Sequence, residues 1–193
     1  YLNTLKPTSP IKNNKSMYDK VIIIQGESAN KHHMSIYGYD KNTTPFLSFL
    51  KSNDKMYIFN AIAPANQTQY SIPMLYTKAT VRNFEQAFTH SVSLVSNFRL
   101  YGYKTYWISN QGKVGSTDTT VSSIAQEANA VTYSKKCMYT YKTKSDIEIL
   151  HYLDKISDNH QKEMYVFHLM GSHADYRRRY TKAIRLYKKP KNI

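Results

Sequence analysis

The sequence predicts an α/β fold with a largely parallel sheet, because short hydrophobic strand candidates alternate with helix-like stretches along the chain. The first candidate, residues 21–24, is a run of four consecutive β-branched residues, a pattern typical of a strand buried on both faces. Further strand candidates follow at residues 56–59, 104–108, 130–133 and 165–170. We therefore expect a sheet of about five strands.

Helices are predicted between these strands from apolar periodicity and from residues that favour helix ends. In residues 117–128, Val121, Ile124 and Ala125 fall on one helical face. Residues 145–157 begin with a capping box, in which Ser145 and Glu148 reciprocally satisfy backbone N–H groups of the first turn. The predicted helices are residues 91–100, 117–128 and 145–157, with shorter ones after Pro45 and around residues 68–76.

The composition is that of a basic globular protein. A chain of 193 residues with 41% hydrophobic and 21% charged residues can bury one proper core, so we expect a single domain. The net charge of +14 favours anionic partners, which include nucleic acid, anionic lipid headgroups and phosphorylated glycolipids. Cys137 is the only cysteine, which excludes an intramolecular disulfide and a cysteine-based zinc cluster.

The beginning of the chain differs from the rest in composition. No apolar run approaches the roughly 18 residues that a membrane-spanning helix needs. Pro7 and Pro10 stand among asparagines and lysines, which predicts a polar tether over residues 1–19 ahead of a domain at residues 20–193. If further chain precedes this tether, a membrane anchor is the natural expectation.

Polar residues directly after a buried strand are the first candidates for chemistry, because ligands of open α/β sheets bind beyond the carboxyl ends of the strands. Glu27 is such a residue, although a carboxylate there could instead cap a loop or pair with Lys31. Three motifs extend this observation: residues 26–39 followed by Asn-Thr-Thr-Pro-Phe-Leu at 42–47, residues 65–74, and residues 167–180.

Together these motifs resemble the phosphoethanolamine transferases, which belong to the alkaline phosphatase and sulfatase superfamily. The resemblance covers residues 20–180 and implies an alkaline phosphatase-like α/β/α sandwich with a mostly parallel sheet. It also implies that the chain is the N-terminal part of the catalytic domain, ending before the last strands and before the family's downstream Asp-His metal pair. Residues 20–193 are therefore expected to be a partial catalytic domain.

The resemblance implies a zinc site with a threonine nucleophile. Glu27 takes the place of the family's glutamate ligand, and Thr68 takes the place of its nucleophile, five residues before Pro73. Coordination to Zn²⁺ lowers the pKa of a bound oxygen by many units, which would activate a threonine hydroxyl. The alternative for Thr68 is an ordinary helix N-cap, with Ser71 as a rival hydroxyl that the family pattern treats as structural.

Four residues are candidates for substrate binding on the same resemblance. His173 matches a substrate-site histidine of the Gly-Ser-His motif, whereas His168 reads as a buried core histidine. Asn110, Gln111 and Lys113 follow a strand where family members contact the phosphoethanolamine headgroup, but a polar turn after a strand is also ordinary loop chemistry.

The function implied is transfer of phosphoethanolamine from phosphatidylethanolamine to an acceptor by way of a phosphorylated threonine. The cysteine-poor sequence fits members that modify the lipopolysaccharide core or periplasmic glucans. The resemblance therefore implies a location on the periplasmic side of the bacterial inner membrane, with membrane-proximal lipid and glycan partners and no nucleic acid.

Three alternatives remain open from the sequence. Another zinc enzyme of the superfamily is one, although no Cys/Ser-x-Pro-x-Arg motif of sulfatases is present and the motifs differ from those of phosphoglycerol transferases. A non-catalytic basic module for nucleic acid or a membrane surface is a second, since +14 and 18 tyrosines offer cationic grooves and stacking surfaces. A folded but inactive remnant is the third.

Overall fold

The computed structural model describes residues 18–112, 119–135, 145–156 and 158–173 together with Tyr176 and Arg179. Lys113, Cys137 and nearly all of the predicted tether lie outside the described residues. The chain divides into two compact units, one formed by the residues up to Glu27 and from Pro64 onward, the other by Ser28–Ala63. Within each unit the residues contact mainly one another.

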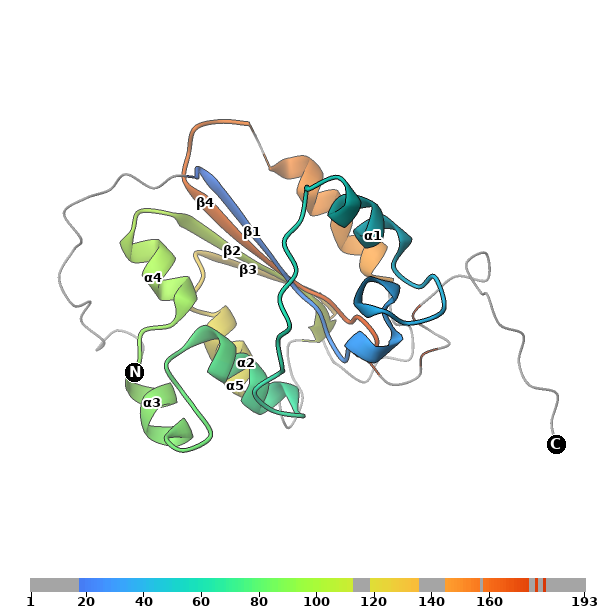
Figure 1. Cartoon of the computed structure of the whole chain (residues 1–193). Coiled ribbons are helices and arrows are strands. Elements are labelled where there is room, and N and C mark those ends of the chain that lie inside the picture. The colour runs from blue at the N-terminus through green and yellow to red at the C-terminus, as the bar shows by residue number, and fades with distance from the viewer. Residues whose placement is uncertain are drawn as a thin grey trace. The chain divides into compact units, whose positions relative to one another are not determined.

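The larger unit is built on a four-stranded parallel sheet (Figure 1). Its strands are β1 (Lys20–Gln25), β2 (Lys104–Gly112), β3 (Ala130–Lys135) and β4 (Glu163–His168), in the spatial order β1-β4-β2-β3. All three strand pairs run parallel, with Ile23 opposite Val166 and Trp107 opposite the same residue. The predicted α/β class with a parallel sheet is confirmed.

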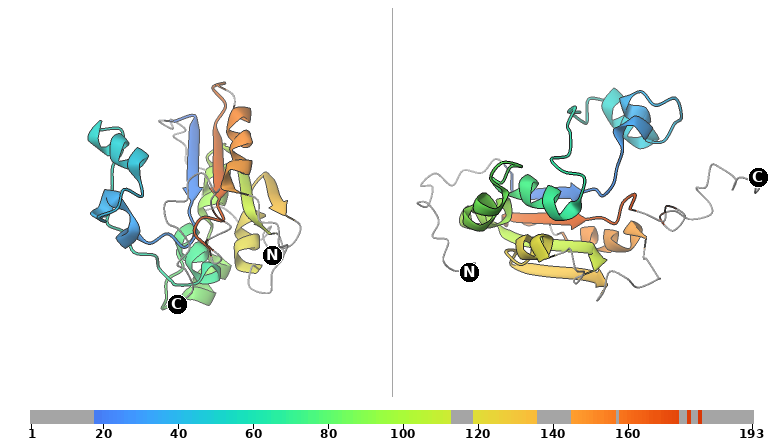
Figure 2. Two further views of the ribbon diagram at one scale, coloured as in Figure 1. Left: turned by 90° about the vertical axis from the view of Figure 1, so that its right-hand side faces the viewer. Right: turned by 90° about the horizontal axis from the view of Figure 1, so that it is seen from below.

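Helices cover both faces of this sheet (Figure 2). On one face, α2 (Thr68–Tyr76), α4 (Leu94–Leu100) and α5 (Thr119–Ala125) pack against Trp107, Met164 and Val166. On the other face, the 3₁₀ helix η3 (Asp146–Lys155) packs Ile149 against Ile108, Tyr165 and Phe167. Because strand side chains alternate between faces, these two cores make three layers, α/β/α.

Several predicted elements differ from the structure. Residues 56–59 form no strand, because they lie in the small unit, where they have no strand to pair with. Within the predicted helix 145–157, Asp146–Lys155 form the 3₁₀ helix η3 rather than an α-helix. Strand β2 continues to Gly112, so the predicted turn at Asn110 is strand. Helix α3 (Phe84–His90) has no counterpart among the predicted elements.

Strand β1 is less buried than its run of β-branched residues predicts. Among the described strands it pairs with β4 alone, so it lies at an edge of the sheet. Val21 and Ile23 pack on the core shared with α2 and α4, whereas Ile22 and Ile24 are 45% and 67% exposed. A continuous apolar run cannot distinguish a central strand from an edge strand, because strand order is set by distant segments.

The unit of residues 28–63 is a set of short helices held by hydroxyl groups. It contains the 3₁₀ helices η1 (Lys31–His33) and η2 (Ser35–Tyr37) and the α-helix α1 (Pro45–Ser52), which follows the predicted Thr-Pro start. Thr44 Oγ1 lies 3.0 Å from Ser35 Oγ and accepts from the Ile36 N–H, and Thr43 donates to the His33 carbonyl. The two threonines therefore fasten the start of α1 to the preceding loop.

None of the helices formed by the described residues has the length and apolar character that crossing a membrane requires.

Candidate active site at the carboxyl end of the sheet

Glu27 and Thr68 meet where β1 ends and α2 begins. Glu27 follows β1 after one glycine, and Thr68 is the first residue of α2. The Thr68 Oγ1 hydroxyl donates a hydrogen bond of 2.9 Å to Glu27 Oε2, across 41 positions of sequence. The fold thus joins the two residues that separate sequence motifs predict as a metal ligand and a nucleophile.

The alternative role of Thr68 as an N-cap does not fit this geometry. The N-cap position of α2 belongs to Gln67, whose backbone is extended and whose side chain makes no capping bond. Thr68 stands one residue later, and its hydroxyl is directed to Glu27 instead of to the helix backbone. An anionic oxygen at this helix start would be stabilised by the positive end of the helix dipole.

Helix α2 is held in place by a bond that its internal proline makes necessary. Pro73 has no backbone N–H, so the carbonyl of Gln69 lacks its intrahelical donor. The Thr120 hydroxyl, from α5, donates to that carbonyl at 2.7 Å. This contact ties the helix that carries Thr68 to its neighbour on the same face of the sheet.

The turn after β4 packs directly against the backbone of Glu27. Ser172 N–H donates to the Glu27 carbonyl at 2.9 Å. Gly171 has φ of +52°, and a Cβ at this position would lie 2.5 Å from the Glu27 carbonyl oxygen and 2.8 Å from its nitrogen. Only glycine fits so close an approach.

His168 ends β4 as a buried residue, as the sequence predicts. Its side chain is 2% exposed, its Nδ1 lies 3.3 Å from Ser109 Oγ, and its ring packs edge-on to Trp107. Burial lowers the pKa of His168 to about 4, although the negative charges of Glu27 and Asp146 act in the opposite direction. The ring is therefore neutral at pH 7.

The remaining predicted site residues do not gather around Thr68 through any direct hydrogen bond that the structure records. Asn110 is fully buried, donates to Asp146 at 2.7 Å and accepts from Ser134 Oγ at 2.7 Å. Gln111 is 5% exposed and donates to the Leu169 carbonyl at 2.9 Å. Such burial favours a supporting role for both side chains, so their contact with substrate stays a prediction.

His173 lies in the turn after β4, within two residues of Gly171. Its N–H donates to the Met170 carbonyl, and its own carbonyl accepts from Arg179 Nε at 3.0 Å. The side chain is partly exposed. Its predicted contact with substrate stays a prediction.

Asp146 is a further residue of this region that no sequence motif indicates, because acidic residues in the first turn of a helix are common. In the structure, Ser145 does cap η3 by accepting from the Ile147 N–H. The Asp146 carboxylate turns instead to Asn110 and to the turn after β4. The role of Asp146 is visible only from its contacts in the folded structure.

The Glu27–Thr68 pair fits part of a zinc site. A carboxylate and a hydroxyl held 2.9 Å apart offer two oxygen ligands, and zinc in proteins takes three or four ligands. Within the part of the chain that the structure describes, no cluster of three or more His, Cys, Asp or Glu residues could hold a metal. Zinc binding by Glu27 and Thr68 would therefore need further ligands from outside these residues.

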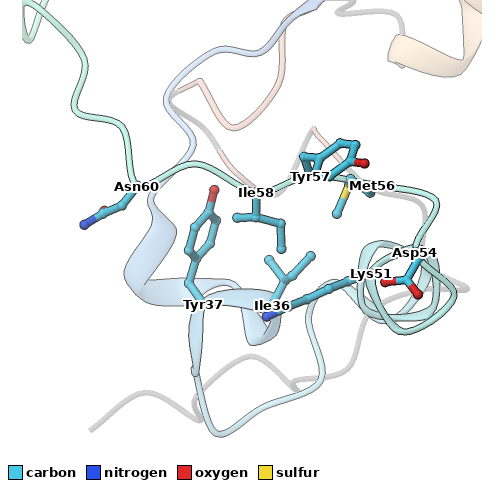
Figure 3. A pocket seen from close by; sticks show the side chains of 8 residues that line it. All are labelled: Ile36, Tyr37, Lys51, Asp54, Met56, Tyr57, Ile58 and Asn60. Carbon is cyan, nitrogen blue, oxygen red and sulfur yellow. The ribbon is translucent and has the colours of Figure 1, made fainter.

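The unit of residues 28–63 contains a separate cavity of about 620 Å³ (Figure 3). Ile58 points toward Ile36 across it, and Lys51 and Asp54 add a positive and a negative group to its wall. Its full lining is Ile36, Tyr37, Lys51, Asp54, Met56, Tyr57, Ile58 and Asn60. None of the predicted site residues lines it, so the candidate active site remains at Glu27 and Thr68.

Comparison with known families supports the motif resemblance. Residues 19–192 match the family described as sulfatase, which is nearly the whole chain. The chain therefore belongs to the sulfatase family.

Within that family, the chain is similar to phosphoethanolamine transferases of Escherichia coli strain K12. It is 26% identical over 183 residues to EptC, covering 92% of this chain and 31% of EptC. It is 29% identical over 175 residues to OpgE, covering 89% of this chain and 32% of OpgE. The chain thus spans about a third of the length of these relatives.

The fold is shared with a solved structure of the same group. The C-terminal periplasmic domain of EptC from Escherichia coli, solved in complex with Zn, has a TM-score of 0.79 at 24% identity. The match covers 88% of this chain and 48% of that domain. At this identity the likeness concerns the fold, and it confirms the predicted alkaline phosphatase-like architecture.

Proposed function

We propose that the protein transfers phosphoethanolamine from phosphatidylethanolamine to a lipopolysaccharide or periplasmic glucan acceptor, with Thr68 as the nucleophile. The observation that carries the proposal is the 2.9 Å hydrogen bond from Thr68 Oγ1 to Glu27 Oε2, which unites two motif residues at the carboxyl end of the sheet. The names of the relatives EptC and OpgE, both phosphoethanolamine transferases, support the same reaction class.

In the first step, Thr68 Oγ1 attacks the phosphorus of the donor and the bond from phosphorus to the diacylglycerol oxygen breaks. Diacylglycerol leaves with a proton, and the phosphoethanolamine group stays on Thr68. Glu27 holds the hydroxyl proton of Thr68 before attack. The start of α2 stabilises negative charge that develops on the oxygen.

In the second step, an acceptor oxygen attacks the same phosphorus and the bond to Thr68 breaks. The acceptor gives up a proton, and the Thr68 hydroxyl is restored. Zinc held by Glu27 and Thr68, together with ligands from outside the described residues, would supply a Lewis acid for the phosphoryl group and favour ionisation of the Thr68 hydroxyl. The net charge of +14 favours anionic lipid and phosphorylated acceptors.

We place this reaction on the periplasmic side of the bacterial inner membrane. The solved relative EptC is described as having a periplasmic domain with this fold, which supports the location. His173, Asn110, Gln111 and Lys113 remain the candidate contacts to the headgroup.

Intact-mass spectrometry tests the nucleophile directly. The protein is loaded with zinc and incubated with phosphatidylethanolamine, and the adduct is mapped by peptide analysis. We expect a single phosphoethanolamine group on Thr68, absent in Thr68→Ala. The matched control is Ser71→Ala, one turn further along α2, which should keep the adduct. A folded, zinc-loaded protein that never carries the adduct would contradict the proposal.

A further inference from the structure

The carboxylate of Asp146 accepts hydrogen bonds from three N–H groups at the carboxyl end of the sheet. Its Oδ1 accepts from Asn110 Nδ2 at 2.7 Å and from the Met170 N–H at 2.8 Å. Its Oδ2 accepts from the Gly171 N–H at 2.8 Å. Hydrogen bonds to an ionised acceptor are among the stronger ones in proteins, so Asp146 anchors the turn that follows β4.

Asn110 makes the anchor itself rigid. Its Nδ2 donates to Asp146, while its Oδ1 accepts from Ser134 Oγ, which lies on β3. Asn110 has no exposed surface, and it comes from the interior strand β2. The position of the Asp146 carboxylate is therefore set by two strands of the sheet as well as by its own helix.

The turn that Asp146 anchors contacts the backbone of Glu27. Gly171, whose N–H Asp146 holds, approaches so near that a Cβ on it would lie 2.5 Å from the Glu27 carbonyl oxygen. The next residue, Ser172, donates its N–H to that same carbonyl at 2.9 Å. The contacts thus run without a gap from Asp146 through the turn to the backbone of Glu27, and from the Glu27 carboxylate to Thr68.

We propose that Asp146 is a positioning residue for the active site: by holding the turn at residues 170–172 against the Glu27 backbone, it fixes the Glu27 carboxylate at Thr68. Asp146 touches neither Thr68 nor Glu27 through any hydrogen bond recorded for the described residues, so its effect passes through the turn. The inference rests on the proposed function only for its kinetic readout.

The main test compares Asp146→Asn with Glu148→Gln. The first change places an NH₂ group where N–H donors now point, so at least one bond to the turn is lost. The second removes the same charge from the same first turn of η3, but at an exposed side chain with no bond to the turn. A general effect of charge at the start of η3 would appear in both variants.

Hydrogen exchange followed by mass spectrometry gives the first readout. In Asp146→Asn we expect amides 170–172 to exchange about tenfold faster or more, in line with the loss of one charge-assisted hydrogen bond. Amides of β2 and β4 should keep their protection, and Glu148→Gln should match the parent protein. Unchanged exchange in the turn, or an equal loss of protection throughout the sheet, would overturn the proposal.

The rate of adduct formation on Thr68 gives the second readout. We expect Asp146→Asn to lower the rate at saturating phosphatidylethanolamine by about tenfold or more, with the concentration for half-saturation unchanged. The reason is that the variant disturbs the placement of the Glu27 carboxylate relative to Thr68 and not the binding of the donor. A looser turn with an unaltered rate would overturn the proposal. If the parent protein itself forms no adduct, the proposed function fails, whereas the exchange experiment still decides whether Asp146 holds the turn.

A double variant that exchanges the two side chains, Asn110→Asp with Asp146→Asn, covers the case in which the single variant fails to fold. It restores a hydrogen-bonded amide–carboxylate pair but leaves only one oxygen at position 146 for the two turn amides. We expect a folded protein whose turn still exchanges fast. Full restoration of protection at residues 170–172 would overturn the proposal. It would mean that the bond between the side chains at positions 110 and 146, and not the bonds from position 146 to the turn, protects these amides.

Discussion

At the scale of single residues, burial outweighs the nearby negative charges of Glu27 and Asp146 and keeps His168 neutral. The ring lies inside the sheet core, where the protonated form loses its hydration, so the pKa falls to about 4. The neutral imidazole keeps the contact with Ser109 and the edge-on packing with Trp107.

This pKa predicts how stability depends on pH. The pKa of His168 is about 6.5 in the unfolded chain and about 4 in the folded chain, so between these pH values only the unfolded chain is protonated there. The free energy of unfolding therefore falls as pH falls through this window. The total loss is about 3 kcal/mol, from roughly 1.4 kcal/mol per pKa unit. Denaturant titrations at pH 7, 5.5 and 4.5 should show that the free energy of unfolding depends less steeply on pH in His168→Gln than in the parent protein.

The control for this measurement is His160→Gln, the same substitution at an exposed side chain, whose Nδ1 lies 3.2 Å from Asp19 Oδ2. It shows what the exchange of a histidine for a glutamine does by itself to the measured free energy of unfolding. An equally steep loss of stability in His168→Gln would mean that other groups cause the acid sensitivity.

At the scale of elements, α2 depends on a neighbour to complete its hydrogen bonds. Because Pro73 has no backbone N–H, the Gln69 carbonyl has no hydrogen-bond donor within the helix. The Thr120 hydroxyl of α5 donates to this carbonyl instead. The helix that presents Thr68 is therefore positioned through a side chain of another helix. Ile72 and Tyr76 add apolar packing against the core on the same face.

Thr120→Val should destabilise the protein by about 1–3 kcal/mol, because it leaves a half-buried carbonyl without its donor while conserving shape. Thr89→Val is the matched control. The exposed Thr89 hydroxyl donates to the Glu85 carbonyl one turn back on its own helix, and its loss should change stability by less than about 0.5 kcal/mol. Chemical denaturation of both variants measures the difference, and equal values would argue against a special role for the Thr120 bond.

At the scale of the whole molecule, strand order leaves β1 at an edge of the described sheet with one apolar face exposed. Ile22 and Ile24 point to that exposed face, and Ile23 points to the core. Exposed apolar edges promote pairing between molecules, because backbone N–H and C=O groups there have no sheet partner. The net charge of +14 opposes association by mutual repulsion.

A lysine on the exposed face of β1 should reduce self-association. Ile24→Lys is expected to keep the free energy of unfolding within about 1 kcal/mol, since the side chain is largely exposed, and to lower the fraction of oligomer seen by light scattering at low salt. Ile23→Lys is the contrasting variant and should destabilise by about 3 kcal/mol or more, because it brings a charge to the core. Unchanged association in a folded Ile24→Lys protein would exclude β1 as the contact edge.

The fold class, most strands and helices, the buried state of His168, and the choice of Glu27 and Thr68 as candidate residues could all be predicted from the amino-acid sequence. These features depend on local patterns, such as apolar periodicity, β-branched runs and short motifs, which neighbours in sequence carry. Three features became visible only in the folded chain: β1 is an edge strand of the described sheet, Asn110 and Gln111 are buried within β2, and Asp146 faces the turn beside Glu27. Each of those outcomes depends on contacts between segments tens of residues apart, and no local pattern encodes which distant segment a side chain will meet.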